Sequence, residues 1–126
     1  MQSDRPINLS KYLYNIFMKK IAFEGSSLDD LREFPPTARN EAGYQLDKVQ
    51  HGLEPDDFKP MPTVGKGVWE LRITDEAGQF RVIYIAKLKD AIHVLHCFQK
   101  KSQKTAQKDL DISNKRLREL QQGLKS

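Results

Sequence analysis

Two arginines occupy matching positions in two stretches with the period-two pattern of β-strands, VWELRIT and then FRVIYIA. Arg72 and Arg81 each alternate with the large aromatic residue of their stretch, so we expect both guanidinium groups on one face of a sheet. Guanidinium groups are planar, permanently charged donors, and two of them side by side would form a phosphate-binding site. The alternative is a solvated face on which these arginines pair with Glu70 or Asp75.

A run of lysines follows the last apolar stretch of the chain. HCFQKKSQKT begins like the end of a buried strand and then presents Lys100, Lys101 and Lys104. Clustered ammonium groups repel one another, and a bound phosphate would relieve that repulsion. The same run would also suit a solvated corner between a strand and a helix. We expect the lysines to emerge near the face that carries the arginines.

Histidines are the other candidates for chemistry. His96 lies closest to the lysines and is a candidate acid or base, since imidazole titrates near neutrality. His93 and His96 are three residues apart on one strand, so we expect them on opposite faces and unable to share a metal. Cys97 is the single cysteine, which excludes an internal disulfide, and no paired Cys/His spacing indicates zinc. The sequence predicts neither a metal nor a cofactor.

The elements that must position these residues follow from hydrophobic periodicity. Residues 19–24 are expected to form a strand, residues 26–53 two helices, and residues 106–124 a C-terminal helix. Residues 54–67 contain three prolines and two glycines and are predicted to be a loop. The expected order is therefore β-α-α-β-β-β-α. The predicted class is α+β, an antiparallel sheet with an N-terminal helical hairpin and a C-terminal helix.

Composition and charge favour one soluble domain. The 126 residues suit a single core, and no apolar run is long enough for a transmembrane helix, so we expect a cytoplasmic protein. Residues 24–57 hold nine acidic and three basic residues, whereas residues 96–126 hold three acidic and eight basic ones. This asymmetry favours a polyanionic partner for one side of the molecule. Residues 1–17 are predicted to be an accessory arm, with Met18 a second plausible start and residues 18–126 the domain.

Three blocks in a fixed order carry a family resemblance. GVWELRI, FRVIYIA and HCFQKKSQKT follow a helical hairpin, and together they resemble the RelE/ParE toxin superfamily, most closely its HigB-like, phage-related branch. The resemblance covers about residues 18–120. It implies a small α+β fold and the toxin of a toxin–antitoxin pair, an endoribonuclease that cuts mRNA in the ribosomal A site. It also implies a neutralising antitoxin, in the HigB branch usually a small helix-turn-helix repressor of the HigA type.

The resemblance also implies roles for particular residues. Arg81 matches the family arginine thought to stabilise the scissile phosphate, and Arg72 matches a basic position on the neighbouring strand. Lys101 stands where many relatives carry arginine or lysine after the last strand, and Lys100 lies beside it. Lys66, in a loop between two glycines, is a candidate contact to the RNA backbone, as are Lys100 and Lys104.

Two departures from the family pattern concern proton transfer. Many ribonuclease members place a tyrosine in the C-terminal segment, and none occurs here after Tyr84. Glu70 stands where some members carry a lysine. His96 or a lysine would then have to move the proton. Without a metal, positioned arginines and lysines would stabilise the phosphorane formed when the RNA 2′-OH attacks the adjacent phosphate.

Two rival functions stay open at this level. A ParE-like member would poison DNA gyrase as a binding inhibitor and would cut no RNA. A repurposed member would only bind its antitoxin or RNA.

Overall fold

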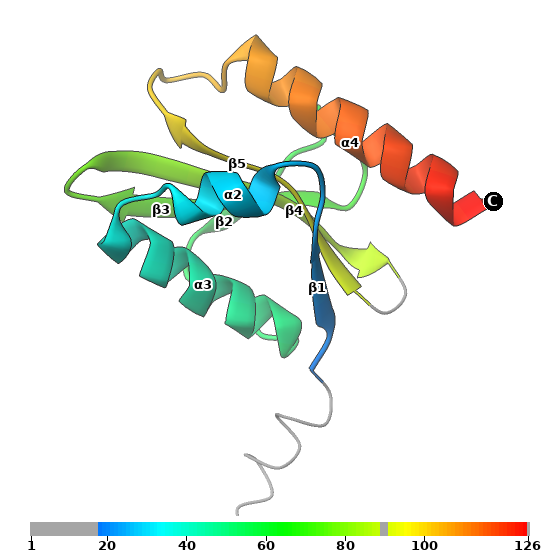
Figure 1. Ribbon diagram of the computed structural model, residues 1–126, viewed down its shortest axis with the longest axis horizontal. Coiled ribbons are helices and arrows are strands. Elements are labelled where there is room, and N and C mark those ends of the chain that lie inside the picture. Colours follow the sequence, from blue (N-terminus) through cyan, green and yellow to red (C-terminus); the bar gives the residue numbers. More distant parts are fainter. Residues whose placement is uncertain (1–17, 89–90, 126) are drawn as a thin grey trace, which may run out of the picture.

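The computed structural model describes residues 18–88 and 91–125. Its five strands and three helices, all within these residues, form an α+β fold. The strands are β1 (Lys20–Phe23), β2 (Phe58–Pro60), β3 (Val68–Asp75), β4 (Gly78–Leu88) and β5 (Ala91–Lys100), and the helices are α2 (Ser27–Arg32), α3 (Pro36–Gln50) and α4 (Gln107–Lys125). The strands form one sheet, with α2 and α3 on one face and α4 on the other (Figure 1). The α+β class is confirmed. The arm predicted at residues 1–17 lies outside the described residues.

The sheet has the strand order β1-β5-β4-β3-β2. Strands β2 to β5 are paired antiparallel, as expected, but β1 runs parallel to β5. The prediction of a purely antiparallel sheet is wrong at this edge. Parallel neighbours require a long crossover, and here α2, α3 and the other three strands lie between β1 and β5 in the chain.

Strand β2 lies within the segment that the sequence predicted to be a loop, so that prediction is wrong for Phe58–Pro60. The prolines suggested a loop because proline cannot donate to a strand ladder. At the edge of a sheet that donor is not needed, and Pro60 ends the strand opposite Trp69. The rings of Phe58 and Trp69 lie 5.0 Å apart, which helps to hold the short strand in place. The missed strand brings Lys59 directly opposite Glu70.

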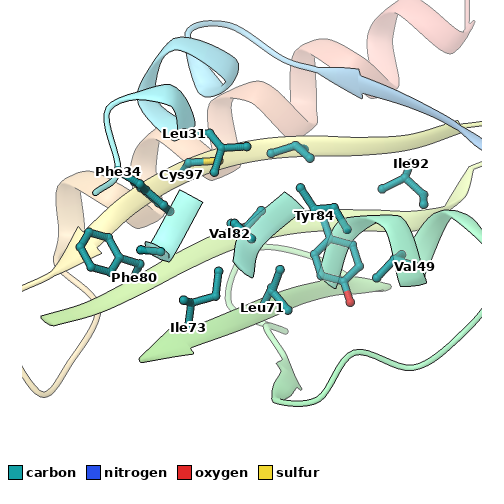
Figure 2. Close-up of a cluster of buried hydrophobic side chains, with 14 residues drawn as sticks. Leu31, Phe34, Val49, Leu71, Ile73, Phe80, Val82, Tyr84, Ile92 and Cys97 are labelled. Carbon is teal, nitrogen blue, oxygen red and sulfur yellow. The ribbon is translucent and has the colours of Figure 1, made fainter. Parts of the chain in front are cut away.

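The period-two pattern of β3 and β4 is confirmed, because alternate residues enter two different apolar clusters. Leu71, Val82 and Tyr84 pack under α2 and α3 in one cluster, part of which Figure 2 shows. Ile83 and Ile85 pack under α4 in the other. A sheet buried on both faces explains why apolar residues of β5 lie on both of its faces, and β5 lies inside the sheet, as predicted.

A β-bulge in β5 changes where its histidines point. Tyr84 is opposite Val94 and Ile83 is opposite His96, so Leu95 is an extra residue in the ladder. His93 and His96 therefore both face the α4 side, and the prediction that they point to opposite faces is wrong. Alternation alone cannot anticipate an inserted residue.

Arg116 ties α4 to the rest of the molecule. Its Nη1 donates to the Leu95 carbonyl oxygen at 2.9 Å, and its Nη2 donates to Ser26 Oγ at 3.0 Å. Gly25 leaves room for this guanidinium, because an added Cβ would lie 2.4 Å from Arg116 Nε. The backbone of Gly25 also has φ +55°, a conformation that favours glycine.

This packing predicts that Gly25→Ala destabilises the protein by about 1–3 kcal/mol, because it adds backbone strain and displaces Arg116. The measurement is the free energy of unfolding from urea titration. Gly43→Ala is the matched control, since nothing lies near its added Cβ in the middle of α3, and it should stabilise by about 0.5–1 kcal/mol. Equal effects of the two substitutions would contradict the role assigned to Gly25.

Candidate phosphate-binding site

The antiparallel register places Arg72 directly opposite Arg81 on the sheet face that carries α4. Arg72 is 39% exposed at its side chain, and its Nε lies 3.9 Å from Asp57 Oδ1. Its backbone N–H also donates to the Asp57 carbonyl oxygen at 2.9 Å. The expected pair of guanidinium groups on one face is therefore present. The alternative, in which the arginines pair with Glu70 or Asp75, is only partly right. Arg72 pairs with Asp57, and Arg81 lies beside Glu70.

The Arg81 side chain is almost covered, with 4% of its surface exposed. Its Nη1 donates to the Phe80 carbonyl oxygen at 2.9 Å and to Gln79 Oε1 at 3.4 Å. Its Nε lies 3.6 Å from Glu70 Oε1. Burial lowers the pKa of Arg81, and the nearby charge of Glu70 opposes that change. A guanidinium is so strongly basic that Arg81 still stays charged at neutral pH.

The lysine run meets Arg81 at the end of the sheet. A hollow of about 380 Å³ is lined by Gln79, Arg81, Lys100, Lys101, Ser102 and Gln103. Lys100 is opposite Gln79 in the register, two residues along from the pair formed by Arg81 and Phe98 and therefore on the same face of the sheet. Partial burial lowers the pKa of Lys100, and the positive charge of Arg81 lowers it further. The expectation that the lysines emerge beside the arginines holds for Lys100 and Lys101.

Lys66 and Lys104 do not line this hollow. Lys104 is exposed in the connection between β5 and α4. Lys66 is exposed in the turn before β3. That turn lies at the far end of β3 from Arg72, roughly 13 Å away at the usual rise of a strand. A contact of either lysine with RNA stays a prediction, and it would require RNA to extend beyond the hollow.

The structure places His96 apart from the arginines, under the first turn of α4. Its Nε2 lies 2.7 Å from Asp109 Oδ1, its ring stacks on Phe98 at 5.0 Å, and its Nδ1 is buried without a hydrogen-bond partner. The side chain is 7% exposed. Burial lowers the pKa of His96, and the hydrogen bond and charge of Asp109 oppose that change. His96 lines a separate hollow, about 630 Å³ in volume, between α2 and α4.

The sequence did not indicate two charged residues, Lys59 and Asp109, which the structure places beside Glu70 and His96. Lys59 was missed because β2 was predicted to be a loop, whereas the structure places Lys59 opposite Glu70. Asp109 escaped because an acidic residue in the first turn of a helix usually needs no partner beyond the helix dipole. Within the described residues, no group of three or more histidines, cysteines or carboxylates could hold a metal ion.

Comparison with solved structures identifies the class of fold. The chain is similar to a mutant of the toxin RelE from E. coli, solved in the free state, with a TM-score of 0.57 and 12% sequence identity. The match covers 82% of this chain and 98% of that chain. The protein therefore has a RelE-like α+β fold.

Residues 29–118 match the sequence model of the phage-derived, Gp49-like protein family. The chain belongs to this family, and the resemblance to the RelE/ParE superfamily is confirmed. Its placement in the HigB-like branch stays a prediction. No curated protein matches the sequence. Among the described residues, no helix is both long enough and apolar enough to cross a membrane.

The buried position of His96 predicts how stability depends on pH. The pKa of His96 is lowered from 6.5 in the folded protein, so below about pH 6.5 the unfolded chain binds its proton first. Stability should therefore fall as the pH decreases from 6.5, until the folded form is protonated too. His96→Gln should flatten this part of the profile, measured as the free energy of unfolding at each pH. The same slope in both proteins would contradict the assignment.

Proposed function

We propose that this protein is the toxin of a toxin–antitoxin pair and that it cleaves mRNA on the ribosome. The observation that carries the proposal is the cross-strand pair of Arg72 and Arg81 beside Lys100 and Lys101. Arg81, Lys100 and Lys101 line one hollow, and Arg72 lies opposite Arg81 on the same face, so these cations can meet a phosphate that carries extra negative charge in the transition state. The RelE-like fold and the name of its E. coli relative, a toxin, support the same function.

In this proposal the RNA 2′-OH passes its proton to solvent water as its oxygen attacks the adjacent phosphate, and the bond from phosphorus to the 5′ oxygen then breaks. The need for a 2′-OH restricts the substrate to RNA. Arg81 and Arg72 stabilise the phosphorane, and Lys101 holds the backbone. The proton for the departing 5′ oxygen comes from Lys100 and not from His96. The lowered pKa of Lys100 makes its proton easier to lose, and Lys100 lines the same hollow as Arg81. His96 is held by Asp109 in the other hollow and is therefore not placed to supply this proton.

Two partners follow from the proposal. The first is the translating ribosome with its mRNA, reached in the cytoplasm. The second is an antitoxin, for which a helix-turn-helix protein of the HigA type is the expected kind. The opposite charges of residues 24–57 and 96–126 suit two partners, because the basic side would face RNA while the acidic helical hairpin stays free.

Arg81→Ala should abolish growth arrest when the protein is induced without its antitoxin. Loss of one such donor typically lowers a rate by about 100- to 1,000-fold. Removing Arg81 also leaves Glu70 without one of its two cations, so folding must be checked by circular dichroism. Arg81→Lys keeps the charge, loses the planar fork, and should also lose most activity. Arg118→Ala, an exposed change on α4, is the control and should remain toxic.

Mapping of mRNA 5′ ends after induction separates the proposal from its rivals. New ends within translated messages support the ribonuclease. A DNA-damage response without new ends would favour the gyrase inhibitor. A folded wild-type protein that is harmless but binds an antitoxin tightly would favour the repurposed relative. Unchanged toxicity in a folded Arg81→Ala protein would refute the role of Arg81.

Lys100→Arg tests proton transfer separately from binding. Arginine keeps the positive charge but cannot release a proton at neutral pH. We therefore expect cleavage of ribosome-bound mRNA to slow by about 100-fold, while RNA binding stays within about threefold. The matched control is Lys101→Arg, which should preserve both quantities. If Lys100→Arg cleaves at the wild-type rate, another group moves the proton.

A further inference from the structure

Glu70 is a completely buried carboxylate in the middle of the sheet. It has no exposed surface, and neither of its oxygens has a hydrogen-bond partner. A buried charge without hydrogen bonds is costly unless opposite charges lie close by. Lys59 Nζ and Arg81 Nε supply them, at 3.8 Å and 3.6 Å from Glu70 Oε1. The carboxylate therefore depends on one cation from β2 and another from β4.

The two cations differ in how far they reach the surface. The Lys59 side chain is 45% exposed, whereas the Arg81 side chain is 4% exposed. The Nε of Arg81 is buried and has no hydrogen-bond partner of its own, so its main attraction is the charge of Glu70. In this arrangement Arg81 lines the hollow of Lys100 and Lys101 while its Nε lies beside Glu70. A phosphate in that hollow would have to draw Arg81 away from Glu70.

We propose that Glu70 is a positioning residue that holds Arg81 against the sheet in the free protein. When a phosphate draws Arg81 into the hollow, Lys59 remains as the cation beside Glu70. Lys59 thus acts on the phosphate site through Glu70 and not by touching the ligand. The ligand is an RNA phosphate, so this inference rests on the proposed function.

A positioning role and a purely structural role for Glu70 predict different effects of its replacement on RNA binding. A purely structural Glu70 would change stability alone when replaced. A positioning Glu70 competes with the ligand for Arg81, so neutralising it should tighten binding. A lysine that touched RNA directly would contribute to RNA binding whether residue 70 is charged or neutral.

The probe is a short RNA with 2′-O-methyl groups, which cannot be cut by 2′-OH attack, and its dissociation constant is measured by fluorescence anisotropy at one fixed salt concentration. Glu70→Gln should tighten binding by about tenfold, the scale of one unit charge acting across a partly exposed site. Lys59→Met should weaken binding several-fold in the wild-type background. In the Glu70→Gln background it should change binding by less than about twofold, because its effect passes through the carboxylate. Lys115→Met, exposed on α4, is the control for general loss of positive charge.

A second measurement needs no RNA. Exchange of the Arg81 Nε proton with water, followed by NMR, should be slow in the wild type and at least about tenfold faster in Glu70→Gln, once the side chain is released. Adding the probe RNA to the wild type should shift the same signal. This test uses the wild-type protein alone and does not depend on the folding of a variant.

The outcomes separate the inference from the proposed function. RNA binding that is unchanged or weaker in folded Glu70→Gln would overturn the inference and leave the proposed function standing. An equal loss from Lys59→Met in both backgrounds would overturn the role of Lys59. Fast proton exchange in Glu70→Gln, with no RNA binding by any variant, would support the hold of Glu70 on Arg81 and overturn the release of Arg81 by a phosphate of free RNA. The proposed function is tested separately, by toxicity and by new mRNA 5′ ends after induction.

Discussion

The alignment of β3 against β4 is the constraint on which the rest of this protein depends. It sets Arg72 opposite Arg81 on one face, and it sets Leu71 opposite Val82 on the other. A slip of one residue would exchange the two faces, so guanidinium groups would enter the apolar layer under α3. The tight connection between Asp75 and Gly78 and the apolar layers on both faces exclude such a slip. The packing of the core and the cross-strand pair of arginines are therefore consequences of one register.

Burial of charge is the second theme of the site. Glu70 and Arg81 lie inside the sheet layer, where water screens them little, and the attraction between them offsets part of the cost of burying each charge. A buried ion pair of this kind is weak evidence for stability, since apolar residues of similar size would often pack as well. Its presence fits a site that must keep a guanidinium charged and ready beside a surface hollow. Lys59 and Lys100 extend the charge cluster toward solvent on either side.

Most of the fold was predictable because it follows from periodicity. The alternation in VWELRIT and FRVIYIA predicted two strands and their faces correctly, and the apolar run of β5 predicted an interior strand. The errors fall where local pattern and tertiary context disagree. Proline marked Phe58–Pro60 as a loop, although an edge strand tolerates it, and the extra Leu95 shifted His96 to the face that alternation did not predict.

The sequence by itself determined the α+β class, the shared face of Arg72 and Arg81, and the lysines that follow β5. These features depend on residues close together in the chain, where strand geometry leaves little freedom. Only the tertiary structure decided which charges meet. Lys59 reaches Glu70 through strand pairing, and Asp109 reaches His96 because α4 folds back over the sheet. Such contacts join distant segments, so their partners depend on how whole layers pack, which no local pattern specifies.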